Sequence, residues 1–364
     1  MNPPRISFAD VKAVLLDRLE QLVRELFPDG SYASGRKYWM ARNPSRKDDN
    51  PGSFWIWMSG PKRGGWCDSA SGQKGDVIKL IALARGGSNV EAKKWGQWWA
   101  GMDPSEPPAA RAKRLEEADQ RKRQAEADAA AELERNRRSA HGIWLHGEPL
   151  ALKDGSRNPR AALAFAYLEK RGIDLSRLPR IPGCTRLLFD QRHVESGKIF
   201  RALGSVMIGA DHSFQALHRV FIGDDAEKIP ERPQRKIWPD FLGGFIPVWD
   251  AGTGISAKVQ AARGELTPAI VVEGIEDGFA AAIGNPGHRV RAAGSLGNLK
   301  HLPIFSCDDS LTVFADNDWG KPQAQKQLDA AAAELADRGQ ATGCAVRIAR
   351  SFLGKDANDL LKGE

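Results

Sequence analysis

The strongest constraint on the fold is a regular alternation of apolar and helical segments in the C-terminal part of the chain. Apolar runs of strand length occur at AIVV (269–272), HRVRAA (288–293), LTVFA (311–315) and CAVRIA (344–349). Helical patterns at 275–284 and 322–339 separate them. Strands that alternate with helices are typical of a parallel sheet with helices on its faces. We therefore predict a Rossmann-like α/β domain over residues 263–364.

Acidic residues follow these apolar runs. They form three sets: Glu273 with Glu276 and Asp277, Asp316 with Asp318, and Asp356 with Asp359. The carboxyl ends of parallel strands form one edge of a sheet, where functional groups gather. Two carboxylates about 4 Å apart repel each other by roughly 4 kcal/mol at an effective dielectric of about 20, and a divalent cation removes that repulsion. Oxygen ligands without histidine suit Mg²⁺, so we predict a metal site. The alternative is that these acids are helix caps and surface residues.

The order and spacing of these acids resemble the Toprim domain, which DnaG-type primases, topoisomerases and some nucleases share. The matching motifs are VVEGIEDGFAA, VFADNDWG and GKDANDLL, and the first is most similar to the Toprim of phage, plasmid and mobile-element primases. The resemblance implies metal binding by Glu273, Asp277, Asp316, Asp318 and Asp356. It also implies a catalytic role for Glu273, Asp316 and Asp318, with Mg²⁺ or Mn²⁺ as the cofactor.

A second resemblance lies in the N-terminal part of the chain. The segment from NPSRKDDNPGSFWIW to GWCDSASGQKGDVIKLIA is similar to the zinc ribbon that opens DnaG-type primases. Where that family has its zinc ligands, this chain has Asn43, Arg46, Asp68 and Ser71. Structural zinc takes Cys or His ligands, usually four of them, and Cys67 alone cannot hold it. We therefore predict a small ribbon-like, DNA-binding module over residues 1–101 that contains no zinc.

Tryptophans are the residues expected to hold this module together in place of zinc. The candidates are Trp55, Trp57 and Trp66. Exposed aromatic and basic side chains can instead stack on single-stranded DNA and neutralise its charge. The sequence leaves both roles open for each tryptophan.

Two further regions lie between these modules. Residues 102–140 begin with prolines and continue with mixed charges and many alanines, which predicts a charged helical linker. Residues 141–262 resemble the basic nucleotidyl-transfer subdomain that precedes Toprim in primases, through the strand-turn-strand pattern GSVMIGADHSFQALHRVFIGDD (204–225). The candidates for contact with nucleotide or DNA phosphates are His218, Arg219, Arg235 and Lys236. Since adjacent strand residues point to opposite faces, only one of His218 and Arg219 can face a groove. The alternative is a solvated basic face.

Composition narrows the class of protein. A net charge of +7 is compatible with a nucleic-acid partner. No apolar stretch of about 18 residues occurs, so no membrane span is predicted, and the acids within the first apolar run do not fit a signal peptide. The four cysteines lie far apart and do not form the pattern of a disulfide framework. We therefore expect a cytoplasmic protein of a bacterial or phage-infected cell.

Together these features predict an α+β multidomain DNA primase. It would make short RNA primers on a single-stranded DNA template from ribonucleoside triphosphates, by metal-dependent nucleotidyl transfer. The alternatives are a Toprim nuclease and a non-catalytic replication accessory protein that binds single-stranded DNA. A topoisomerase would need a tyrosine nucleophile, and none of Tyr32, Tyr38 and Tyr167 lies in a recognisable setting. No GxxxxGK[ST] motif occurs in the chain, so a separate helicase is the natural hypothesis for an unwinding partner.

Overall fold

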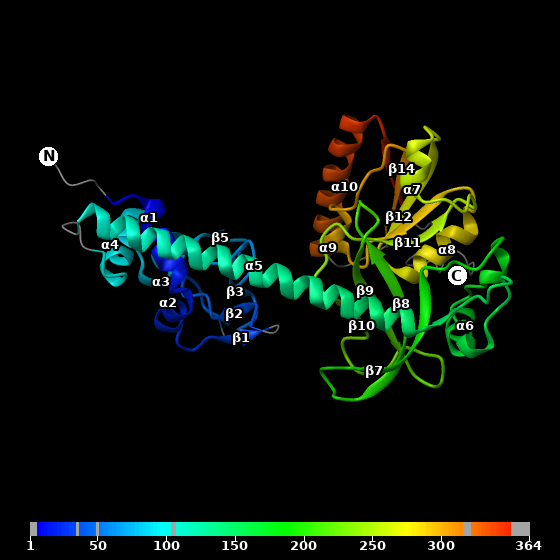
Figure 1. The fold of residues 1–364 in the computed structure, drawn as a ribbon, viewed down its shortest axis with the longest axis horizontal. Coiled ribbons are helices and arrows are strands. Elements are labelled where there is room, and N and C mark those ends of the chain that lie inside the picture. Colours follow the sequence, from blue (N-terminus) through cyan, green and yellow to red (C-terminus); the bar gives the residue numbers. More distant parts are fainter. Residues whose placement is uncertain (1–5, 34–35, 49–50, 103–106, 316–321, 351–364) are drawn as a thin grey trace. The chain divides into compact units, whose positions relative to one another are not determined.

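The structure is a computed structural model that describes residues 6–33, 36–48, 51–102, 107–315 and 322–350. The chain divides into two compact units, Met1–Glu132 and Leu133–Glu364 (Figure 1). The division falls inside a long helix, and the predicted boundary at 262/263 falls within the second unit. The four-part domain division drawn from the sequence stays a prediction.

The first unit combines an antiparallel sheet with short helices and the first part of a long one. Its short helices are α1 (Phe8–Asp17), α2 (Leu19–Leu26), α3 (Val77–Arg85) and α4 (Asn89–Trp99). Its sheet has the order β1-β2-β3-β4-β5, formed by β1 (Ser31–Ala33), β2 (Tyr38–Ala41), β3 (Phe54–Trp57), β4 (Trp66–Asp68) and β5 (Lys74–Gly75). The helix starts follow local capping rules: Ser7 and Asp10 form a capping box before α1, and the Asp76 carboxylate accepts from two backbone N–H groups of α3.

The sheet of this unit buries one face and leaves the other partly exposed. Trp39, Phe54, Ile56 and Trp66 point into a core with α1, α2 and α3, because successive strand residues alternate between faces. Of the three tryptophans expected to hold the module together, Trp66 does lie in this core. Trp55 and Trp57 are half-buried, lie on the opposite face and pack against each other, with ring centroids 6.0 Å apart.

The helix α5 (Pro108–His146) spans the region predicted to be a helical linker. Its first part is largely exposed and carries i,i+4 ion pairs such as Arg123 with Asp119 at 2.7 Å. Its last turns are different, because Ala140, Ile143 and Trp144 pack against the sheet that follows them in the second unit.

The second unit begins with an antiparallel sheet of order β10-β9-β8-β7-β6. Its strands are β6 (Glu148–Pro149), β7 (Thr185–Arg192), β8 (Ile199–Ile208), β9 (Phe214–Ile222) and β10 (Arg235–Trp238). The connection from β6 to β7 contains η1 (Pro159–Ala161), α6 (Ala162–Glu169) and η2 (Leu175–Arg177). The predicted strand-turn-strand at 204–225 is the hairpin of β8 and β9.

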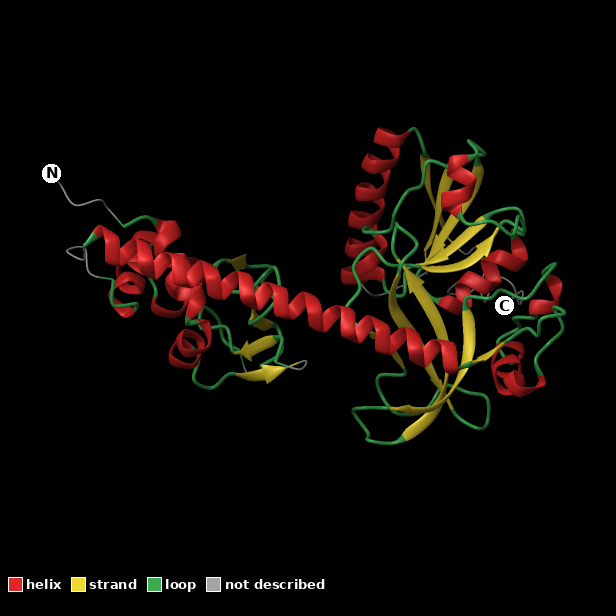
Figure 2. Cartoon of the chain, viewed as in Figure 1, coloured by secondary structure: helices red, strands yellow, loops and turns green. Residues whose placement is uncertain are grey.

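The C-terminal sheet has the order β11-β13-β12-β14-β15 and is parallel except for β11 at one edge. Its strands are β11 (Ile246–Asp250), β12 (Thr267–Val272), β13 (Arg289–Ala292), β14 (Asp308–Ala315) and β15 (Ala345–Arg350). The helices between them are α7 (Ala257–Ala262), α8 (Ile275–Gly284), α9 (Leu296–Leu299) and α10 (Pro322–Thr342) (Figure 2). This arrangement confirms the parallel α/β sheet that the alternating pattern predicts.

Helices cover both faces of this sheet. Leu328 and Leu335 of α10 pack on the face that carries Val271 and Val313. Phe279 of α8 packs on the other face, in a core that also contains residues of α6, β8 and β9. The two sheets of the second unit therefore share one core, and α8 lies within it. In the described part of the chain, no helix is long and apolar enough to span a membrane.

Candidate functional site

Glu273 is the first residue after β12 and is partly exposed. The turn after β13 fixes the backbone at this point, because the N–H of Gly294 donates to the carbonyl of Glu273 at 2.9 Å. The N–H of Ala293 donates to the carbonyl of Val272, also at 2.9 Å. The carboxyl end of β12 is thus held in place by the neighbouring strand, as a functional group at a sheet edge requires.

The strand β14 lies directly beside β12 and runs parallel to it. Val271 pairs with Val313 in this register, so the two strands end at the same edge of the sheet. β14 ends at Ala315, the residue before Asp316 in sequence. Asp316, Asp318 and Asp356 lie outside the described residues. The structure therefore places Glu273, which follows β12, and Ala315, the last residue of β14, at the same edge of the sheet.

A small depression lies at this edge, and Glu273 lines it. Its other described lining residues are mostly apolar: Leu296, Leu299, Phe314, Ala315, Ala324, Gln325 and Leu328. Apolar walls lower the local dielectric, which strengthens the attraction between a carboxylate and a cation that enters.

Asp277 lies in the first turn of α8 and folds back toward the residue after Glu273. A Cβ atom placed on Gly274 would lie 2.8 Å from Asp277 Oδ2. Both carboxylates offer oxygen donors only, which is the donor set of a hard cation such as Mg²⁺. Among the described residues, no group of three or more His, Cys, Asp or Glu is placed to hold a metal ion. Glu273 and Asp277 fit part of a magnesium site, and the remaining predicted ligands are the undescribed acids.

The close approach of Asp277 to Gly274 gives a prediction. Gly274 has a φ of −99° and a ψ of 161°, which alanine adopts without strain. In Gly274→Ala, the new methyl group is expected to push the Asp277 carboxylate aside and lower metal-dependent activity at least several-fold, with little change in thermal stability. Steady-state activity and a melting curve of the same preparation measure both. A fall in the melting temperature with unchanged activity would contradict this role for the glycine.

Glu276, the neighbour of Asp277, has a different environment. It is 7% exposed, and its Oε1 accepts from the Tyr167 hydroxyl at 2.7 Å and lies 2.8 Å from Lys228 Nζ. Burial opposes its ionisation, but the Lys228 ammonium and the two hydrogen bonds outweigh burial and lower the pKa of Glu276 to about 2. Glu276 is therefore charged and paired. The sequence placed it among the acids after β12 but gave no sign of its partners.

His218 is not a surface residue. It lies on β9, is 1% exposed and has no hydrogen-bond partner at either ring nitrogen within the described residues. Burial lowers the pKa of His218 to about 4, so the ring is neutral at physiological pH. A ring buried in this way does not support a phosphate contact, and the assignment of His218 as one stays a prediction.

The other basic candidates lie around the β9–β10 pair. Arg219 and Lys236 are cross-strand partners and share the face opposite to His218. Burial lowers the pKa of Arg219, whose guanidinium lies 5.7 Å from the ring centroid of Phe221. Lys236 Nζ lies 2.5 Å from the Glu195 carboxylate, and Arg235 is exposed.

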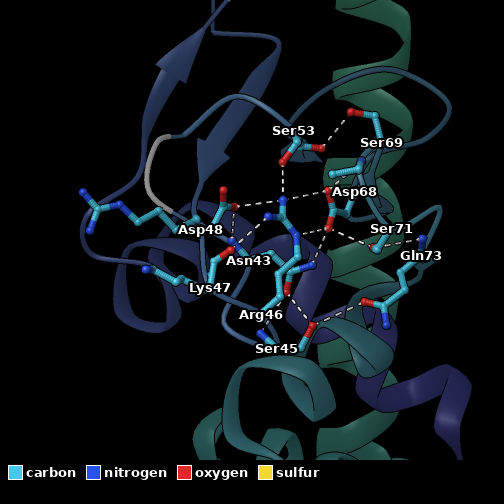
Figure 3. A network of polar contacts seen from close by, with 12 residues as sticks. Asn43, Ser45, Arg46, Lys47, Asp48, Ser53, Asp68, Ser69, Ser71 and Gln73 are labelled. Atoms are coloured by element: carbon cyan, nitrogen blue, oxygen red, sulfur yellow. Dashed lines mark hydrogen bonds and ion pairs between the residues drawn. The ribbon is translucent and has the colours of Figure 1, made fainter. Parts of the chain in front are cut away.

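Asn43, Arg46, Asp68 and Ser71, which the sequence comparison aligned with the zinc ligands of the resembling family, come together in the first unit. Asn43 Nδ2 donates to Asp68 Oδ2 at 2.6 Å, Arg46 Nε donates to the same oxygen at 2.9 Å, and Ser71 Oγ donates to it at 2.9 Å. Figure 3 shows the Arg46 guanidinium between the carboxylates of Asp48 and Asp68. We call Asn43, Arg46, Asp68 and Ser71 the ribbon network.

The ribbon network explains how a buried charge is tolerated in this unit. The Asp68 side chain has no solvent exposure. Burial opposes its charge, but hydrogen bonds from Arg46, Asn43, Ser71 and the backbone outweigh burial and hold the pKa of Asp68 well below its usual range. A guanidinium and a carboxylate thus form the centre of the ribbon network.

This convergence gives a further prediction. The quadruple variant Asn43→Cys, Arg46→His, Asp68→Cys and Ser71→Cys is expected to bind zinc tightly, because the four side chains already meet around one point and supply a Cys₃His ligand set. Metal content of the purified variant, compared with the unchanged chain, measures this. A folded quadruple variant that takes up no zinc would contradict a shared tetrahedral position.

Comparison with known families assigns two segments of the chain. Residues 268–364 match the Toprim domain, and residues 134–248 match a domain of unknown function (DUF7146). A search of the curated proteins gives no match. The C-terminal sheet is thus of the Toprim type, and Toprim domains typically bind Mg²⁺.

Solved primase structures show weak similarity to the chain. The Aquifex aeolicus primase (zinc-binding and RNA polymerase domains) is 16% identical, with 97% of this chain and 82% of that chain covered and a TM-score of 0.36. The E. coli primase catalytic core is 16% identical, with 63% of this chain and 76% of that chain covered and a TM-score of 0.39. The DnaG primase catalytic domain bound to single-stranded DNA is 17% identical, with 63% of this chain and 74% of that chain covered and a TM-score of 0.38. Similarities this low carry no functional argument.

Proposed function

We propose that this Toprim-domain chain is a DNA primase that makes short RNA primers on single-stranded DNA. The observation that carries the proposal is the parallel pairing of β12 with β14, which brings Glu273 and the residue before Asp316 to one edge of the sheet. That edge supports a shared acidic site for phosphoryl transfer. A primer 3′-hydroxyl would attack the α-phosphate of an incoming ribonucleoside triphosphate, and pyrophosphate would leave.

The proposed metal ligands are Glu273, Asp277, Asp316, Asp318 and Asp356. Bound Mg²⁺ or Mn²⁺ would neutralise phosphate charge and stabilise the transferring phosphoryl group. Glu273 would hold the cation that faces the substrate phosphate, and apolar neighbours such as Phe314 would exclude water from this carboxylate. The chain needs no side-chain nucleophile, since the substrate hydroxyl is the nucleophile.

Arg219, Arg235 and Lys236 remain the proposed contacts for triphosphate or template phosphates. Arg235 is exposed, so it can bind a phosphate without any rearrangement of the protein. Lys236 would exchange Glu195 for a phosphate, and Arg219 would need to leave its half-buried position.

The partly exposed face of the first unit's sheet is the proposed template-binding surface. Tyr38 pairs across strands with Trp57, and Met40 pairs with Trp55, so these four side chains share that face. Lys37 Nζ lies 5.5 Å from the Tyr38 ring centroid, and Lys62 Nζ lies 5.4 Å from the Trp57 ring centroid. Aromatic rings with adjacent ammonium groups suit bases and phosphates of a single strand.

Trp57→Ala is therefore expected to weaken binding of single-stranded DNA about 10-fold, since stacking on one aromatic side chain contributes about 1–3 kcal/mol per base. Fluorescence anisotropy with a labelled oligonucleotide measures the affinity. The matched control is Trp98→Ala, which removes a 72% exposed tryptophan of α4 that is not on the sheet. Equal loss of affinity in the two variants would contradict a template role for the sheet face.

The cellular setting is also a proposal. We place the protein in the cytoplasm, in the replication of a phage, plasmid or mobile element, on the similarity of its VEGIED motif to the Toprim of such primases. A replicative helicase is the proposed unwinding partner.

A synthesis assay tests the proposed function against its alternatives. The full chain is incubated with single-stranded DNA, labelled ribonucleotides and Mg²⁺ or Mn²⁺, and the assay is repeated with Asp316→Ala. Short RNA products that disappear in the variant are expected. Shortening of the template would indicate a nuclease instead, and binding without either product would leave the non-catalytic accessory role.

A further inference from the structure

Three residues from distant parts of the second unit meet at the start of α8. The Tyr167 hydroxyl, from α6, donates to Glu276 Oε1 at 2.7 Å, and Lys228 Nζ, from the segment after β9, lies 2.8 Å from the same oxygen. Tyr167 has no solvent exposure. We call Tyr167, Lys228 and Glu276 the Glu276 clamp.

Stability alone does not explain the Glu276 clamp. Taking two charges out of water costs several kcal/mol per ion in proteins, and apolar residues of similar volume often replace a buried ion pair without loss of stability. The surrounding core is apolar and would accept such residues. A polar contact in this place is better suited to orienting one element relative to others than to stabilising the fold.

The element that the clamp orients is α8. A second contact of α8 lies at Gly278, which packs tightly against β11. A Cβ atom placed on Gly278 would come within 2.8 Å of Val248 Cγ2. The clamp holds the first turn of the helix through Glu276. Packing at Gly278 limits how far the helix can move away from the sheet, and the clamp fixes its rotation about its own axis.

The rotation of α8 determines where Asp277 points. Adjacent helix residues are about 100° apart around the axis, so a Glu276 held toward α6 sets the direction of Asp277. A carboxylate about 6 Å from the axis moves by about 1–2 Å when a helix rotates by about 10–20°. Functional constellations require their groups to be held to within about 0.5 Å, so an unclamped helix would misplace this ligand.

We propose that Tyr167, Lys228 and Glu276 are positioning residues that hold α8 in the rotation at which Asp277 joins Glu273 in binding a divalent cation. The inference rests on the proposed function, in that it assigns a cation to these two carboxylates. It adds a role for residues that contact neither the cation nor the substrate.

The variant Lys228→Met distinguishes a positioning role of Lys228 from a purely electrostatic effect of its charge on cation binding. Removing a positive charge close to a cation site would tighten cation binding by electrostatics alone. Loss of positioning instead weakens it, because Asp277 moves away from the place where it would meet the cation. We expect Mn²⁺ affinity to fall about 10-fold in Lys228→Met, measured on the full chain by electron paramagnetic resonance of free Mn²⁺, without nucleotide or template. The matched control is Lys198→Met. It breaks a 2.6 Å pair between Lys198, directly before β8, and Glu231, in the segment before β10, and is expected to leave Mn²⁺ affinity unchanged.

A second variant keeps the test valid if Lys228→Met is unstable. The triple change Tyr167→Phe, Lys228→Met and Glu276→Met makes the site apolar and is expected to restore the melting temperature while Mn²⁺ affinity stays low. Unchanged or tighter Mn²⁺ binding in Lys228→Met, or recovery of affinity in the triple variant, would overturn the inference and leave the proposed function intact. Absence of Mn²⁺ binding by the unchanged chain would overturn both the metal role and the inference.

Discussion

Asp68→Ala is expected to lower the free energy of unfolding of the first unit by about 3 kcal/mol, because it leaves the buried donors of the ribbon network without an acceptor. The Asn43 amide, the Ser71 hydroxyl and the N–H of Ala70 all donate to this carboxylate. Arg46 would lose the ion pair that compensates its partial burial. Urea unfolding followed by tryptophan fluorescence measures the change, since Trp39 and Trp66 lie in the core of the unit.

The same network predicts a pH dependence with a definite sign. The pKa of Asp68 is lowered in the folded state, so its contribution to stability is present above the unfolded value of about 3.9 and is lost as the pH falls through the folded value. The unchanged chain is expected to lose stability on acidification, and Asp68→Ala is expected to show a flatter profile below about pH 4.

A matched control for Asp68 is Glu20→Gln, which removes a carboxylate paired with Arg24 on the surface of α2 at 2.8 Å. Exposed pairs of this kind contribute little, so only a small change is expected. A loss of stability in Glu20→Gln equal to that of Asp68→Ala would contradict the special role of the ribbon network.

Glu273→Gln is expected to reduce RNA synthesis by at least about 100-fold, the loss typical of removing one electrostatic group from a phosphoryl-transfer or acyl-transfer site. The amide keeps the shape of the side chain but loses the charge that a divalent cation requires. Because Glu273 is partly exposed at the end of β12, the folded state is expected to be unchanged. Initial rates of ribonucleotide incorporation measure the effect, with circular dichroism as the check on folding.

Glu265 provides the control for Glu273. It is exposed and precedes the amino end of the same strand, β12, so it lies at the opposite edge of the sheet. Glu265→Gln is expected to retain full activity. Retained activity in Glu273→Gln, or an equal loss in both variants, would show that the carboxyl edge of the sheet is not the site of chemistry.

The sequence predicted the elements that depend on local pattern. Apolar runs between helical segments predicted the parallel sheet. The position of Glu273 after β12 was equally local, since it follows from where an apolar run ends.

Contacts between distant residues were not predictable in this way. Tyr167 and Glu276 are 109 residues apart, and Asn43 and Asp68 are 25 apart. A pattern in one segment does not reveal which buried acid finds which partner. His218 shows the same limit: on β9 its alternation with Arg219 was predicted, but which of the two would be buried depended on the core shared with α8.

The most direct test of the central claim is whether the chain starts RNA de novo. A primase joins two ribonucleotides without a primer, so the first nucleotide keeps its triphosphate. Labelled γ-phosphate, supplied with single-stranded DNA and a divalent cation, is expected to appear in short products and to be absent from reactions of Glu273→Gln. Two results would contradict the account. One is products that carry label from the α-phosphate of a ribonucleotide only when a primer is added, and the other is no labelled products at all.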